Sequence, residues 1–187
     1  MAQKRKDWNG LISGFKASDL VFLDESGCNT DMTRRYAYSL GGSRAVDSAP
    51  LSKPKNTTIL SSIQLDGTLR YTTFSGGTTV ERFKRYLETD LLPHLNDNSV
   101  LIMDNMKSHH AKAVRNLLDS SGIRYIYLPP YSPDLNPIEK LWSKVKAFLR
   151  KFKARTLDAL PNAIQNAFHS VTISDCSGWF RFCGYAL

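Results

Sequence analysis

The chain has 187 residues, of which 42% are hydrophobic and 22% charged, values typical of one globular domain. Its longest apolar runs, residues 20–23 and 100–103, are too short to cross a membrane, and the N-terminal residues lack the apolar stretch of a secretory signal. The 25 lysines and arginines outnumber the 17 acidic residues and give a formal net charge of +8, which favours a polyanionic partner such as nucleic acid.

The first half of the chain predicts mainly strands. Residues 20–23 form an apolar run followed by D-E-S-G, which is typical of a buried strand leading into a turn. Further strands are expected over residues 36–40, 57–65 and 70–74. Asp66-Gly67 predicts a tight hairpin between the last two, because both residues tolerate a positive φ.

The second half alternates between helical and strand patterns. The expected elements are a helix over 80–91, a strand over 100–103, a helix over 111–121, a strand over 123–128, a long helix from 138 and another helix after Pro161. Hairpin strands followed by alternating helices and strands predict an α/β fold, with a mixed sheet flanked by helices.

Asp24 and Asp104 occupy equivalent local positions. Each follows a four-residue apolar run of the kind expected for a strand buried on both faces. If the two strands are parallel neighbours, their carboxylates meet at the carboxyl edge of the sheet, where open α/β sheets bind ligands. The alternative is that each aspartate only opens a turn or caps the next helix.

Glu139 is the third candidate site residue. It follows the loop 128–137 (LPPYSPDLNP), a stiff segment that holds four of the eight prolines. Asn136 suits the N-cap of the following helix, so Glu139 could simply complete a capping box with it. On a helical wheel, however, Glu139 shares a stripe with Lys146 and Arg150 beside the apolar face. That pattern suits a metal site next to a phosphate track.

Three carboxylates from separate elements can hold two Mg²⁺ ions, with Mn²⁺ as a substitute, because these cations prefer oxygen ligands. Two such ions can activate a water and stabilise the leaving oxygen in phosphoryl transfer. The segment 140–155 carries seven basic residues and no acidic one, so Lys146 and Arg150 are expected to contact DNA phosphates. His109, which closely follows Asp104, is either a phosphate contact or an ordinary polar surface residue.

Several stretches resemble the DDE transposases of the mariner superfamily, in particular their bacterial insertion-sequence relatives. They are VFLDESG at 21–27, LIMDNMKSHH at 101–110, YLPPYSPDLNPIEKLWSKVKAFLR at 127–150 and the tail ISDCSGWFRFCGY at 173–185. Asp104 and Glu139 are separated by 34 residues, the spacing that such enzymes use between their second aspartate and final glutamate.

The resemblance implies a ribonuclease H-like fold and Mg²⁺-dependent DNA cleavage and strand transfer, with Asp24, Asp104 and Glu139 as catalytic metal ligands. Relatives carry helix-turn-helix domains before the catalytic domain, and only 23 residues precede Asp24 here. Residues 1–187 are therefore expected to be a single catalytic domain, paired with a separately encoded or frameshift-joined N-terminal DNA-binding portion and acting as a homodimer on DNA.

Two alternatives to transposition stay open. One is a ribonuclease H-like nuclease without strand transfer, and the other is a non-catalytic DNA-binding remnant of a decayed element. The three cysteines, Cys28, Cys176 and Cys183, form no C-x-x-C pair. Their odd number and spacing predict reduced thiols in a cytoplasmic protein rather than a disulfide framework or a zinc site.

Overall fold

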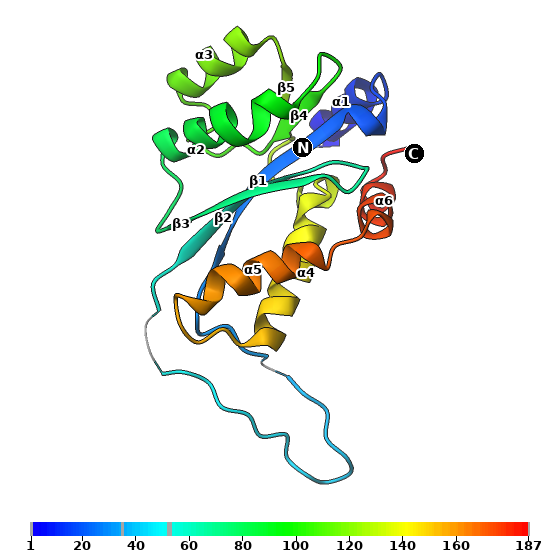
Figure 1. Ribbon diagram of the computed structural model, residues 1–187. Helices are drawn as coiled ribbons and strands as arrows, with labels where there is room; N and C mark the ends of the chain where they lie inside the picture. The colour runs from blue at the N-terminus through cyan, green and yellow to red at the C-terminus, as the bar shows by residue number, and fades with distance from the viewer. Residues whose placement is uncertain (1, 35, 52–53, 187) are drawn as a thin grey trace.

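A computed structural model describes residues 2–34, 36–51 and 54–186, which fold around one five-stranded sheet (Figure 1). The strands lie in the order β3-β2-β1-β4-β5. They are β1 (Leu20–Cys28), β2 (Thr57–Ile63), β3 (Leu69–Ser75), β4 (Val100–Met103) and β5 (Arg124–Tyr127). The first three pair antiparallel, whereas β1, β4 and β5 are parallel, so the sheet is mixed, as the sequence predicted.

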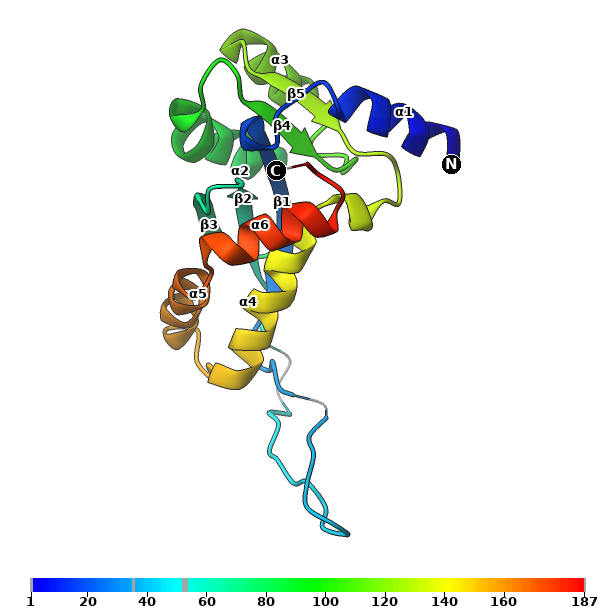
Figure 2. The ribbon, with the colours of Figure 1, turned by 90° about the vertical axis from the view of Figure 1, so that its right-hand side faces the viewer.

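Helices cover both faces of the sheet (Figures 1 and 2). They are α1 (Ala2–Ile12), α2 (Val80–Tyr86), α3 (Lys112–Ser121), α4 (Ile138–Phe152), α5 (Ala159–His169) and α6 (Ile173–Phe182). A π-helical turn (Leu87–Leu91) and a 3-10 turn (Leu92–His94) prolong α2. No helix in these described ranges is both long and apolar enough to span a bilayer.

The alternation of side chains along β1 and β4 builds two separate cores. Phe22 and Ile102 join the core under α4, α5 and α6, while Leu23 and Met103 join the core under α2 and α3. Successive residues of a strand point to opposite faces, so a run that is apolar at every position becomes buried on both sides. The three cysteines are free thiols buried within the fold.

β1 is longer than the sequence predicted. Asp24 to Cys28 continue the strand because they pair with β2, so the expectation of a turn at D-E-S-G was wrong. The hairpin between β2 and β3 is as expected, with Gly67 at φ +89°. There the left-handed backbone region suits a residue without a side chain.

The strand expected over residues 36–40 was also wrong. Residues 36–40 lie on an extended arm between β1 and β2 that runs away from the sheet (Figure 1). Tyr36 and Tyr38 are 91% and 107% exposed. The two tyrosines are spaced as in a strand, but the arm has no neighbouring strand to pair with in the described structure. Helices α1 and α6 were not anticipated from the sequence.

Candidate active site

The register between β1 and β4 brings the two aspartates to the same level of the sheet. Leu23 and Met103 form the last pair of the parallel ladder, and Asp24 and Asp104 are the next residues on their respective strands. The predicted parallel pairing is therefore confirmed. Asp24 lies on the same face of β1 as Phe22, toward α4, while Glu25 lies on the opposite face, toward α2 and α3.

The proline-rich loop then returns the chain to this edge. The Leu128 N–H donates to the Met103 carbonyl at 2.8 Å, and the Asn105 amide donates to the Leu128 carbonyl at 2.6 Å. These bonds tie the loop that follows β5 to the residues that follow β4. The loop leads directly into α4, whose first turn carries Glu139.

Asn136 does stand where the sequence placed it, directly before the helix, because its backbone is extended, that of Pro137 is helical, and the Asn136 carbonyl accepts the Glu139 N–H at 3.2 Å. The side-chain cap expected from Asn136 was wrong, since no described side chain caps α4. The Asn136 side chain is instead buried against the pocket described below, and its Oδ1 has no hydrogen-bond partner among the described residues. Because the capping box is absent here, capping does not explain the glutamate at position 139.

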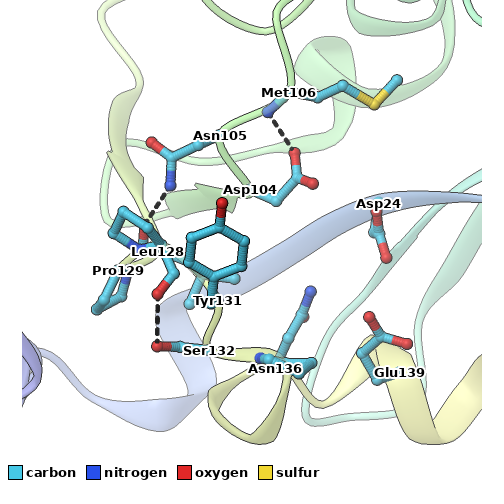
Figure 3. A pocket seen from close by; sticks show the side chains of 12 residues that line it. Asp24, Asp104, Asn105, Met106, Leu128, Pro129, Tyr131, Ser132, Asn136 and Glu139 are labelled. Carbon is cyan, nitrogen blue, oxygen red and sulfur yellow. Dashed lines mark hydrogen bonds between the residues drawn. The ribbon is translucent and has the colours of Figure 1, made fainter. Parts of the chain in front are cut away.

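Asp24, Asp104 and Glu139 all line one open pocket of about 460 Å³. Figure 3 shows the carboxylates of Asp24 and Glu139 pointing toward each other, with Asp104 across the pocket. The rest of the lining comes from the loops that follow β4 and β5, namely Asn105, Met106, Leu128, Pro129, Pro130, Tyr131, Ser132, Pro133 and Asn136. In the described part of the chain, no three His, Cys, Asp or Glu side chains cluster tightly enough to form a complete metal site.

Asp24 is the most buried of the three carboxylates, at 9% exposure. Burial raises its pKa to about 7, and the nearby charges of Asp104 and Glu25 add to the rise. The indole N–H of Trp142, on α4, donates to Asp24 Oδ2 at 3.1 Å and opposes that rise. A cation in the pocket would favour the ionised carboxylate.

Asp104 is half-exposed, and two neighbouring groups fix one of its carboxylate oxygens. Its Oδ1 accepts the Met106 N–H at 2.9 Å and lies 2.9 Å from His109 Nδ1. Burial alone would raise the pKa of Asp104, but the hydrogen bonds to His109 and Met106 outweigh it and lower the pKa. Asp104 is therefore ionised at neutral pH, whereas Asp24, with a pKa of about 7, is only partly ionised there.

His109 lies in the interior and does not contact solvent. Its ring is fully buried, stacks on Phe83 at 4.2 Å between ring centroids, and places Nε2 3.2 Å from Glu25 Oε2. Burial would lower its pKa, yet hydrogen bonds to Asp104 and Glu25 raise it to about 9. The sequence predicted a phosphate contact or a polar surface residue, and a fully buried ring fits neither.

Lys146 and Arg150 line a neighbouring groove of about 760 Å³, which the base of the extended arm completes. They follow Glu139 on α4 by seven and eleven residues, so they lie about 10 and 16 Å further along the helix axis at 1.5 Å per residue. The structure thus brings the three carboxylates into one pocket and the two cations into the next groove along the same helix.

Glu25 and Asn136 were missed as candidate site residues. The period-2 alternation of a strand could have placed Glu25 on the face opposite Asp24, but only if β1 had been extended past residue 23. Asn136 was taken for a cap on local propensity, and its burial depends on how the proline-rich loop packs.

The chain belongs to the DDE superfamily endonuclease family, which it matches over residues 19–161. It is 30% identical over 97 residues to the transposable element Tc1 transposase of Caenorhabditis elegans, a match that covers 50% of this chain and 36% of that protein. The matched range of the endonuclease family contains Asp24, Asp104 and Glu139.

The fold is similar to that of Mos1 transposase. A Mos1 paired-end complex with the left transposon end matches with a TM-score of 0.80 and 19% identity, over 95% of this chain and 57% of that one. The catalytic domain of Mos1 mariner transposase matches with a TM-score of 0.73 and 17% identity, over 96% and 85% of the two chains. These likenesses establish the ribonuclease H-like fold, and the chain spans only part of the Tc1 and Mos1 transposases.

Proposed function

We propose that this domain cleaves and joins DNA phosphodiester bonds, with Asp24, Asp104 and Glu139 as the ligands of two Mg²⁺ ions. The observation that carries the proposal is their arrangement. The three carboxylates come from β1, from the end of β4 and from the start of α4, and they line one open pocket. The absence of a capping box at Asn136 removes the local alternative for Glu139.

The donor set fits hard divalent cations. All three candidate ligands are carboxylates, the oxygen donors that Mg²⁺ and Mn²⁺ accept. Asp24 has a raised pKa because it is buried near two other acids, and a bound cation would compensate for this. Mos1 complexes have been solved with Mg and with Mn. When bound, two such ions supply an activated water and stabilise the leaving oxygen of an in-line displacement.

The chain's own residues would align the reaction. Trp142 fixes Asp24 through its indole N–H, and the Met106 N–H fixes one oxygen of Asp104. Lys146 and Arg150 would bind phosphates to one side of the scissile bond, since they line a groove further along α4, the helix that carries Glu139. Water would attack phosphorus and break the P–O3′ bond, which leaves a 5′-phosphate and a free 3′-hydroxyl. That hydroxyl would then attack a target phosphorus and form a new P–O bond, while the target P–O3′ bond breaks and releases a target 3′-hydroxyl.

Assembly and origin are further parts of the proposal. A Mos1 complex holds a transposon end, and for this protein we propose DNA as the partner, with a separately encoded or frameshift-joined DNA-binding portion that recognises the element ends. The motifs noted in the sequence favour a bacterial insertion sequence, with the protein acting as a homodimer on DNA in the cytoplasm.

The test is a cleavage and strand-transfer assay on labelled duplex with Mg²⁺ or Mn²⁺. Asp24→Asn, Asp104→Asn and Glu139→Gln should each abolish both products while the folded state persists. Asp97→Asn is the matched control, because Asp97 is exposed and precedes β4 at the opposite edge of the sheet. Cleavage without joining would indicate a plain nuclease, and Glu139→Gln activity equal to the parent would remove Glu139 from the site.

A further inference from the structure

Behind the pocket lies a buried pair that the proposed chemistry does not use, formed by Glu25 and His109. The His109 ring is enclosed on three sides. Nε2 lies 3.2 Å from Glu25 Oε2, Nδ1 lies 2.9 Å from Asp104 Oδ1 and 3.3 Å from the Asp104 carbonyl, and Phe83 stacks on the ring face. A ring held in this way cannot turn without losing its contacts to both carboxylates.

The consequence for Asp104 is a fixed carboxylate. The Met106 N–H and His109 Nδ1 approach the same oxygen, Oδ1, each at 2.9 Å (Figure 3 shows the first of these). Rotation of the carboxylate would break both contacts. Oδ2 is therefore the oxygen left for a ligand in the pocket, and the side chain, 43% exposed, lies at the pocket wall.

Stability alone does not explain Glu25. Its side chain is only 10% exposed, and its second oxygen, Oε1, is buried with no hydrogen-bond partner in the described ranges. An acceptor left unpaired in the interior costs about 1–3 kcal/mol. Apolar side chains often replace a buried ion pair without loss of stability. What Glu25 does contact is the far nitrogen of the ring that holds Asp104.

We propose that Glu25 and His109 are positioning residues that orient Asp104 so that Oδ2 faces the metal site. This inference rests on the proposed function, because it takes Asp104 to be a metal ligand. Glu25 holds the His109 ring in place, and the ring in turn holds the Asp104 carboxylate. Residues that orient metal ligands from behind typically change metal affinity by about 10–100-fold when they are altered.

Two substitutions separate the two nitrogens of the ring. In His109→Asn the amide nitrogen takes the place of Nδ1, so the contact to Asp104 is kept and the contact to Glu25 is lost. In His109→Gln the amide nitrogen takes the place of Nε2, so the contact to Glu25 is kept and the contact to Asp104 is lost. The readout is Mn²⁺ affinity of the whole chain, measured by electron paramagnetic resonance of free Mn²⁺. We expect H109Q to weaken binding about 10–100-fold and H109N to stay closer to the parent.

Controls separate orientation from loss of stability. Leu118→Ala opens a cavity in the core under α2 and α3, where Leu118 is fully buried, so it should lower the melting temperature and leave Mn²⁺ affinity unchanged. Glu25→Gln removes the charge at nearly constant volume and gives a second route if H109Q does not fold. We expect E25Q to weaken Mn²⁺ binding in the same direction.

The outcomes are distinct. Equal affinity in the parent, H109Q and E25Q would overturn the positioning role while leaving the proposed function intact. Equal losses in H109N and H109Q would also overturn it, because the effect would then not pass through the Asp104 contact. If Asp104→Asn binds Mn²⁺ as tightly as the parent, the proposed function fails, and the positioning role fails with it.

Discussion

Asp24→Asn should stabilise the metal-free protein while abolishing its activity. Asp24 is 9% exposed, and burial raises its pKa from 3.8 to about 7. Because the pKa is higher in the folded state, ionisation of this carboxyl opposes folding. The penalty is absent below pH 3.8, grows as the pH rises and levels off above pH 7. At about 1.4 kcal/mol per pH unit, it reaches on the order of 4 kcal/mol.

Asparagine has nearly the same shape and stays neutral, so it avoids this penalty. In the presence of a chelator at pH 8, the D24N variant should be more stable than the parent by on the order of 2–4 kcal/mol, and at pH 4 the two should be nearly equal. For a domain of this size the pH 8 difference corresponds to a rise in melting temperature of roughly 5–15 °C. Urea unfolding of both proteins at pH 4, 6 and 8 is the assay. A difference that does not depend on pH, or a less stable D24N at pH 8, would refute the reasoning.

Three further predictions follow from other parts of the structure. Millimolar Mg²⁺ should raise the melting temperature of the parent by mass action and should have a much smaller effect on Glu139→Gln, as a thermal melt would show. Replacing Lys146 and Arg150 together by Ala should weaken binding to all duplexes about equally. It should also make the fall of affinity with rising salt less steep, by the equivalent of roughly two phosphate contacts. An unchanged dependence on salt would show that neither residue contacts DNA phosphates. Asp175→Ala should cost about 1 kcal/mol at pH 7, because Asp175 forms a capping box with Thr172 at the start of α6. The lowered pKa of Asp175 means that this difference should disappear as the pH falls below its pKa, which urea unfolding at pH 7 and pH 2 can check.

The sequence was sufficient to predict those elements whose local pattern agrees with their place in the sheet. The apolar runs before Asp24 and Asp104 predicted two strands buried on both faces, and these strands are parallel neighbours with the aspartates at the same level. Asp66-Gly67 predicted the hairpin because the requirement for a positive φ is local. The mixed sheet followed from the order of these elements.

Contacts between distant residues account for the failures. The polar half of β1 is a strand only because β2 pairs with it across the long arm, and polar residues give no local sign of that pairing. His109 is buried against Phe83 and Glu25, and Glu25 is 84 residues away in the sequence. Asn136 precedes the helix as its propensity predicts, but packing of the proline-rich loop buries its side chain at the pocket instead of letting it cap, and single-residue propensities are easily overridden in this way.

The most direct test of the metal site is anomalous X-ray diffraction from crystals of this chain soaked in Mn²⁺. The proposed function predicts anomalous peaks in the pocket, within coordination distance of Asp24, Asp104 and Glu139, and the positioning role predicts that Asp104 binds through Oδ2. Loss of the peaks in Glu139→Gln crystals grown under the same conditions would support the assignment of that ligand. Mn²⁺ bound only elsewhere on the protein, or a pocket that stays free of Mn²⁺ at saturating concentration, would contradict the central claim.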